Sequence, residues 1–194
     1  MFFSILLLAH IQAAAIPIIL GIRSFKKFEQ INNRKIIPLG FISLGIASIC
    51  EMIDHTQTSW IYIDHSSLFN WLFYSFLSLG LTCLSLSVVK NKFFLITNIF
   101  ISFCSIISYF LFDKKLALLF QVIISIFLII NWQRFFKDWL IILYPIFGIF
   151  FTTFFGINLT TSGDQFWHVF IGPSGTISVV TFYLILKRTD RTTT

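Results

Sequence analysis

The chain has 194 residues, of which 57% are hydrophobic, 19% aromatic and only 11% charged, and it carries a net charge of +6. A soluble domain of this size could not keep so apolar a surface out of water, which excludes the soluble globular classes. The basic residues are scattered through short connectors rather than gathered into a stripe. This distribution argues against a nucleic-acid partner and leaves membrane lipids as the expected surroundings.

Seven largely uncharged apolar runs follow one another along the chain. Each is close to the roughly 20 residues that a helix needs to cross a bilayer. The runs cover residues 2–22, 36–53, 67–89, 93–112, 116–132, 139–157 and 165–186. Because lipid offers no partner for backbone polar groups and the runs do not alternate as barrel strands do, each should be an α-helix. The sequence predicts an all-α fold: one integral membrane domain, residues 1–194, forming a seven-helix bundle.

The first run admits a second reading, because it passes through three small residues, 13–15, as a secretory cleavage site would. No basic segment precedes it, and its apolar character continues through Ile22. We therefore expect residues 1–15 to belong to the first span rather than to a cleaved signal peptide.

The connectors predict the orientation, since Lys and Arg near membrane ends are retained in the cytoplasm. Twelve of the fourteen basic residues fall on one side: Arg23, Lys26, Lys27, Arg34, Lys35, Lys90, Lys92, Arg134, Lys137, Lys187, Arg188 and Arg191. The opposite side has only Lys114 and Lys115. This asymmetry predicts an N-terminus outside and a C-terminus in the cytoplasm of a multi-pass protein in a plasma or inner membrane.

All four histidines fall in the outer half of the predicted bundle, the half away from the cytoplasm. Glu51, Asp54 and His55 stand at i, i+3 and i+4, a spacing that predicts one shared face at the outer end of the second helix. His168 opens the seventh helix, and His10 lies on the order of 12 Å into the first. Unpaired ionisable groups are costly inside a membrane, so these side chains should turn inward, where they are candidates for function.

Metal binding is the chemistry that best uses several neutral imidazoles beside carboxylates. We expect zinc, with His55 and His168 as ligands and His10 as the third. Glu51 would position or deprotonate a zinc-bound water, and Asp64 would orient a ligand or the substrate.

The alternative has no metal. In it the loop between the second and third helices is solvated, with Asp54, His55, Asp64 and His65 as ordinary loop residues. His168 would lie at the headgroup level, and His10 would be satisfied by a neighbouring helix.

Two further features bear on this region. An acid precedes each of two histidines by four residues, Glu51 before His55 and Asp164 before His168, as an acid that fixes an imidazole tautomer would. Glycine and proline interrupt the seventh helix just after His168, in the segment from Ile171 to Gly175. They could kink the helix to open a cavity or permit close packing, and the sequence does not choose between these.

These motifs resemble the CREST superfamily of seven-helix membrane proteins, which includes alkaline ceramidases, progestin and adipoQ receptors and hemolysin-III-like proteins. The family pattern has Ser four residues before His on helix two, Asp near the start of helix three, and two His four apart on helix seven. Here Glu51 and His55, Asp64, and His168 take the matching positions, whereas Glu51 replaces the Ser and Gly172 replaces the second His. The resemblance implies a zinc-dependent hydrolase acting on a lipid amide or ester.

Three functions remain open at this point. The leading one is a zinc hydrolase with a lipid-like substrate at the outer leaflet. The second is a non-enzymatic transporter, receptor or complex subunit that uses the same polar pocket to bind a solute or relay protons. The third is a haem protein, which needs two axial histidines that face each other. Metal content separates the three.

Overall fold

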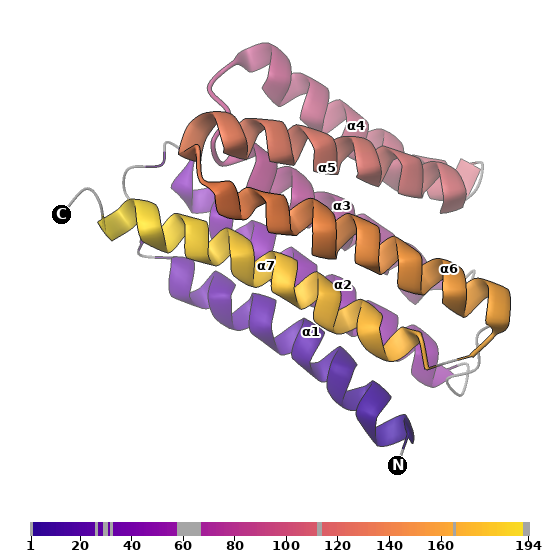
Figure 1. Cartoon of the computed structure of the whole chain (residues 1–194). Helices are drawn as coiled ribbons and strands as arrows, with labels where there is room; N and C mark the ends of the chain where they lie inside the picture. Colours follow the sequence, from indigo (N-terminus) through magenta and orange to yellow (C-terminus); the bar gives the residue numbers. More distant parts are fainter. Residues whose placement is uncertain are drawn as a thin grey trace.

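The computed structural model of the chain describes residues 2–25, 27, 28, 31, 33–57, 67–111, 114–164 and 166–191. Seven helical segments in these ranges are long and apolar enough to cross a membrane, and the described residues contain no strand. The predicted all-α architecture of seven membrane helices is confirmed (Figure 1).

Six of the spans are single α-helices. They are α1 (Phe2–Ser24), α2 (Ile37–Gln57), α3 (Leu68–Leu86), α4 (Lys92–Leu111), α5 (Lys114–Phe136) and α7 (His168–Arg191). A short 3-10 turn, η1 (Arg34–Ile36), leads into α2. The second helix therefore continues to residue 57, four residues beyond its predicted end, and carries Asp54 and His55 within its last turns.

The sixth span is irregular. It begins with a 3-10 turn, η2 (Trp139–Ile142), continues as a π-helix, η3 (Pro145–Phe151), and ends as α6 (Thr152–Ser162). Pro145 has no backbone N–H to donate at the first position of η3. Such π segments occur often at functional sites, and this one borders the interior of the bundle.

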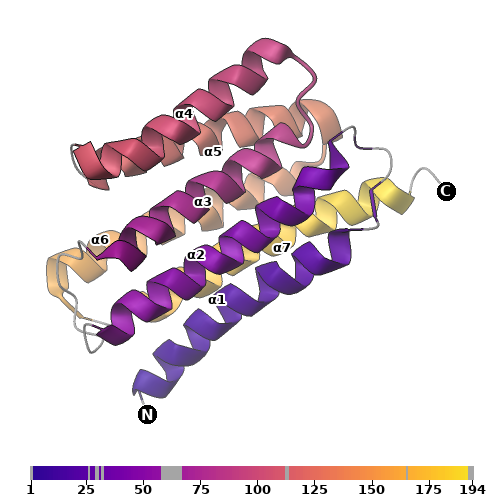
Figure 2. The ribbon, with the colours of Figure 1, turned by 180° about the vertical axis from the view of Figure 1, so that it is seen from behind.

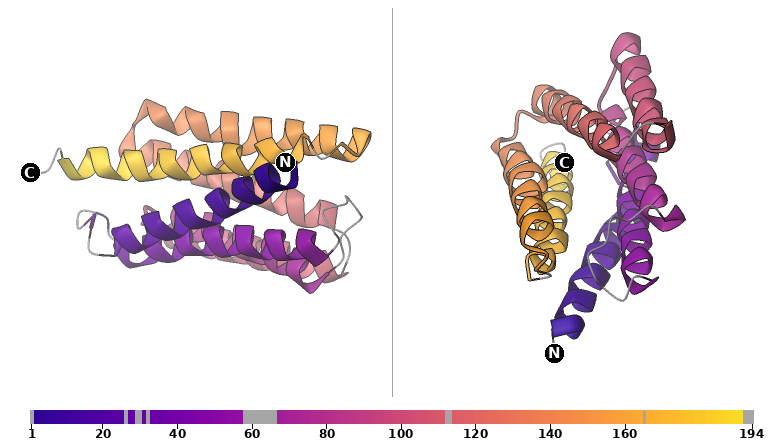
Figure 3. Two further views of the ribbon diagram at one scale, coloured as in Figure 1. Left: turned by 90° about the horizontal axis from the view of Figure 1, so that it is seen from below. Right: turned by 90° about the vertical axis from the view of Figure 1, so that its right-hand side faces the viewer.

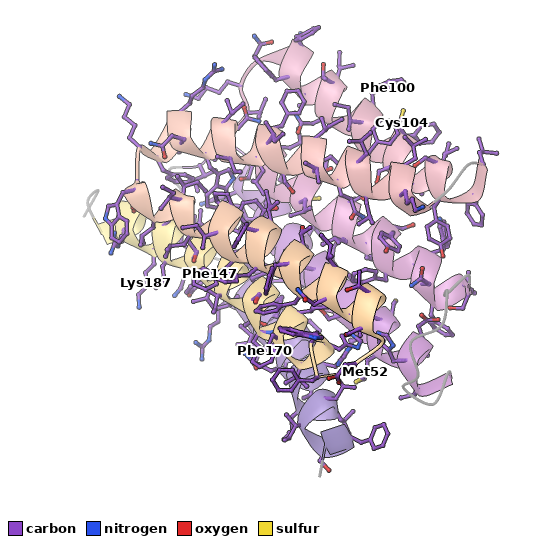
Figure 4. The ribbon with its side chains drawn as sticks, turned by 45° about the vertical axis from the view of Figure 1, so that its right-hand side comes forward. Met52, Phe100, Cys104, Phe147, Phe170 and Lys187 are labelled. Carbon is purple, nitrogen blue, oxygen red and sulfur yellow. The ribbon has the colours of Figure 1, made fainter. Side chains whose placement is uncertain are left out.

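The helices form a ring with one helix outside it. α1, α2 and α3 lie side by side (Figure 2), α5 packs on α3, and α7 packs on both α1 and α6. The end view in Figure 3 shows α6 and α7 on one side and α1 to α3 on the other. α4 packs outside the ring, against α3 and α5. On α4, Phe100 and Cys104 project away from the other helices (Figure 4), and Phe100 is 64% exposed, as expected of a lipid-facing surface.

The two ends of the bundle differ in packing. The outer end is the one predicted to face away from the cytoplasm, and Met52 lies there. Lys187 lies near the opposite, basic end (Figure 4). The large side chains with almost no exposed surface gather mainly toward the basic end: Trp132, Phe28, Phe41, Phe182, Ile37, Leu84, Leu128, Ile185 and Leu186. The indole of Trp132 donates to the carbonyl of Leu84 (2.7 Å) and ties α5 to α3 there. Close packing at this end leaves the outer half to hold the polar groups.

Candidate metal centre

Four side chains from three helices meet in the outer half of the bundle. They are His10 of α1, Glu51 and His55 of α2, and His168 of α7, and one potential ligand atom from each lies within 4.8 Å of those of the others. The ring centroids of His55 and His168 are 4.2 Å apart, and those of His10 and His168 are 4.9 Å apart. We call these four residues the histidine cluster. The histidines were expected to converge if they share a metal, and they do.

Hydrogen bonding within α1 orients His10. Its Nδ1 lies 2.9 Å from the carbonyl oxygen of Leu6, one turn earlier. Because a carbonyl only accepts, Nδ1 carries the hydrogen, and Nε2 is left with a lone pair. This is the tautomer that a metal ligand needs, and His10 is only 4% exposed.

Glu51 points into the bundle, as expected from the cost of a carboxylate in lipid. Its Oε1 lies 3.9 Å from Nε2 of His168, so Glu51 contacts α7. Its side chain is 21% exposed, against 3% for His168. Glu51 is therefore the member of the cluster that also faces open space.

That space is a cavity of about 230 Å³. Its walls come from α1, α2, α3, α5, the sixth span and α7, and Glu51 lies on its wall. Most of the lining is apolar or small, for example Ala13, Leu77 and Phe182. The cavity is large enough to hold part of a small apolar molecule next to the cluster.

Close packing between α1 and α7 brings His10 to His168. A side chain at Gly172 would lie 3.1 Å from the carbonyl oxygen of Ala9 and 3.4 Å from the Ala13 side chain. A Cβ here would push the two helices apart by a few tenths of an ångström, so glycine favours this close approach, one turn after His168 and beside His10. Gly172 therefore serves close packing, whereas a side chain at Gly175 would have nothing within 4 Å. Both glycines line the cavity.

The structure corrects one expectation about α2. Asp54 does not join Glu51 and His55 but turns toward α3, where its carboxylate accepts hydrogen bonds from Ser67 Oγ and from Asn70 Nδ2 (3.4 Å). Tyr109 of α4 donates to Asn70 Oδ1 (2.7 Å) and extends this set across three helices. We call Asp54, Ser67, Asn70 and Tyr109 the Asp54 network. Residues at i and i+3 are about 60° apart around a helix, which is enough to divide them between two neighbours.

Asp164 and Asp64 were also expected to act at the site. Asp164 is exposed and accepts a hydrogen bond from the backbone N–H of Phe166 (2.9 Å). Glu51, rather than Asp164, is thus the acid beside His168, and the predicted orienting role of Asp164 is wrong. Asp64, expected to orient a ligand or the substrate, lies with His65 outside the described residues.

The geometry also bears on the haem alternative. A haem needs its axial imidazoles on opposite faces of the macrocycle. The rings of His10, His55 and His168 contact one another edge-to-face with centroids 4.2 to 5.4 Å apart, which leaves no room for a porphyrin between any two of them. These three histidines therefore do not form the axial pair of a haem.

Sequence reasoning missed the polar side chains deeper in the cavity. Gln121, Ser125 and Tyr144 line it, and the hydroxyls of Ser125 and Tyr144 lie 2.7 Å apart. The available signal was weak, because isolated Ser, Gln and Tyr are tolerated throughout membrane helices. Only the assembled ring shows that the three share one wall.

The fold and the cluster define a multi-pass integral membrane protein of seven helices with a buried histidine and carboxylate centre near one end. The chain matches the family described as "Seven transmembrane receptor" over residues 2–192, and it belongs to that family. No curated protein and no solved structure matches the chain.

Proposed function

We propose that this protein is a zinc-dependent hydrolase that cleaves an amide or ester bond of a lipid. The observation that carries the proposal is the position of the histidine cluster: three imidazoles and a carboxylate meet inside a membrane protein, and the carboxylate, Glu51, lines an apolar cavity. Three nitrogen ligands with a further position left open are typical of catalytic rather than structural zinc.

The donor set fits this ion. Zinc bonds to imidazole nitrogen at about 2.0–2.1 Å, so ligand atoms around a tetrahedral ion stand roughly 3.4 Å apart. The atoms of the cluster lie within 4.8 Å of one another, so side-chain rotations would have to close the difference when the ion binds. The hydrogen bond from His10 to Leu6 already holds that ring in the ligand tautomer.

His10, His55 and His168 would hold the ion, and Glu51 would act on the reacting water. Zinc in such a site supplies Lewis acidity toward a carbonyl oxygen and makes water reactive near neutral pH. Glu51 takes a proton from the water as the water oxygen bonds to the carbonyl carbon. Glu51 then returns that proton to the departing amine or alcohol as the C–N or C–O bond breaks, which leaves a fatty acid.

The cavity supports a lipid as the substrate. Leu118 and Val122 of α5 line it and are 43% and 42% exposed. The sixth span packs chiefly on α7. An opening beside α5 would admit an apolar chain from the surrounding bilayer and place its polar end at Glu51. The resemblance to the CREST superfamily supports the same reaction class.

The family description favours a second candidate, a receptor. In that reading the cluster and cavity bind a ligand without turnover, and binding shifts the bundle between two conformations. Turnover distinguishes the two functions, since a receptor returns its ligand unchanged.

The test is hydrolysis by purified, zinc-loaded protein in detergent micelles. A panel of N-acyl amides and acyl esters with different chain lengths would be supplied, and the released fatty acid measured by mass spectrometry. Glu51→Gln should retain zinc but lose about 100-fold or more of the rate, because the amide cannot take the proton. Asp164→Asn is the matched control: it also removes one carboxylate, but outside the cluster, and should leave the rate unchanged.

Zinc-loaded wild-type protein that hydrolyses no member of the panel would overturn the hydrolase and leave the receptor. A Glu51→Gln variant as active as the wild type would reject the role of Glu51.

A further inference from the structure

A pair of hydroxyl groups lies deep in the cavity, away from the histidine cluster. Ser125 lies on α5, and Tyr144 is the residue that precedes η3 in the sixth span. Their side chains are 5% and 4% exposed. Ser125 lies about 16 Å along α5 from its outer end, near the middle of a bilayer core of about 30 Å. The pair therefore lies far from water at the membrane surface.

The two hydroxyls carry two hydrogens, and their mutual hydrogen bond of 2.7 Å uses one. A serine within a helix commonly donates to the carbonyl four residues earlier. Several serines here do so, such as Ser24 and Ser178, but within the described part of the chain Ser125 and Tyr144 bond only to each other. One hydrogen of the pair is left to meet whatever fills the cavity.

Gln121 adds the complementary group one turn away on the same face of α5. Its Nε2 donates to the carbonyl of Tyr74 (3.0 Å) and to Ser78 Oγ (3.1 Å). Because a carbonyl oxygen can only accept, this network fixes which end of the amide is nitrogen. Both amide hydrogens are used, and among the described residues nothing donates to the Gln121 carbonyl oxygen, although Gln121 lines the cavity.

We propose that Gln121, Ser125 and Tyr144 form a binding site for a hydroxyl group carried on the apolar chain of the ligand. A ligand hydroxyl can accept the remaining hydrogen of the Ser125–Tyr144 pair and donate its own to the Gln121 carbonyl. A plain hydrocarbon would satisfy neither, and leaving buried polar groups without partners lowers its affinity. The ligand class is thus a single-chain lipid with a hydroxyl part-way along the chain.

The hydroxyl site would select a substrate only if the protein is the proposed hydrolase. Its preference for binding a hydroxylated chain does not depend on that function. The test therefore measures binding alone. The probes are dodecanoic acid and its positional isomers with one hydroxyl on the chain, titrated by calorimetry into purified protein in detergent.

The wild type should bind one or two neighbouring isomers about five-fold more tightly than dodecanoic acid, the effect of one net neutral hydrogen bond. Tyr144→Phe should abolish this preference while leaving dodecanoic acid binding within about two-fold, because Ser125 can then donate to the backbone four residues earlier. Ser125→Ala should keep the preference, since the Tyr144 hydrogen becomes available. Tyr109→Phe, which loses a hydroxyl in the Asp54 network and not at the cavity, is the matched control and should behave as wild type.

The same titration on His168→Ala separates this inference from the hydrolase. A preference that persists there supports the hydroxyl site even if no zinc or hydrolysis is found. Wild-type protein that binds all probes equally, or binds none, would overturn it, as would a preference that survives Tyr144→Phe.

Discussion

At the scale of single residues, α2 divides its polar side chains between two sets. Glu51 and His55 turn toward His168 of α7, whereas Asp54 turns toward α3 and is 1% exposed. The i, i+3, i+4 spacing correctly indicated that these residues avoid lipid. It could not say which neighbouring helix each one faces, because that depends on how the helices are arranged around α2.

The Asp54 network gives a prediction about stability. Asp54→Ala removes the acceptor for Ser67 and Asn70 and should lower the free energy of unfolding by about 2 kcal/mol, the range for hydrogen bonds to a charged group. Thermal unfolding in detergent would measure it. Tyr109→Phe, which deletes one neutral hydrogen bond of the same network, should cost about half as much. If Asp54→Ala unfolded at the same temperature as a variant at the exposed Asp164, the network would have no stabilising role.

At the scale of the helices, the six regular spans follow from the length of their apolar runs. The irregular sixth span shows the limit of that signal. A run of apolar residues from 139 to 157 predicts a span but not its 3-10 and π segments, which depend on Pro145 and on packing against α7. The end of α2 was also misplaced, because charged residues normally mark the membrane boundary. Asp54 and His55 remain helical because they find partners inside the bundle.

The close approach of α1 and α7 gives a second prediction. Gly172→Ala adds a methyl group 3.1 Å from the Ala9 carbonyl oxygen and should separate His10 from His168. Zinc affinity should fall about ten-fold, the scale of changes that displace ligands indirectly, and competition with a zinc chelator would measure it. Gly175→Ala makes the same change three residues later, where nothing lies within 4 Å, and should leave zinc affinity unchanged. Equal affinities in both variants would reject the role of this contact.

At the scale of the whole molecule, the distribution of basic residues predicts which end faces the cytoplasm. A reporter that is active only in the cytoplasm should be active when fused after Thr194 and silent when inserted within residues 56–62. The histidine cluster would then lie toward the outer leaflet. The opposite activity pattern would invert the sidedness of the cluster and the cavity.

The ring of helices and its cavity lay beyond sequence reasoning. Seven spans could be read from composition, as could the inward preference of His10, Glu51, His55 and His168. Which helices are neighbours, with α4 outside and α7 against α1, arises from side-chain packing between segments far apart in the chain. For the same reason Gln121, Ser125 and Tyr144 could not be assigned to one wall in advance.

The central claim is that His10, His55 and His168 hold one zinc ion, and the zinc content of purified protein tests it most directly. Protein prepared without chelators and measured by plasma mass spectrometry should contain one zinc per chain, and His10→Ala, His55→Ala and His168→Ala should each lose it while circular dichroism shows the helices intact. His65→Ala, which changes the histidine that lies outside the described residues, should keep it. Wild-type protein that contains no zinc and takes up none when it is added, or a His168→Ala variant that retains a full complement, would contradict the account.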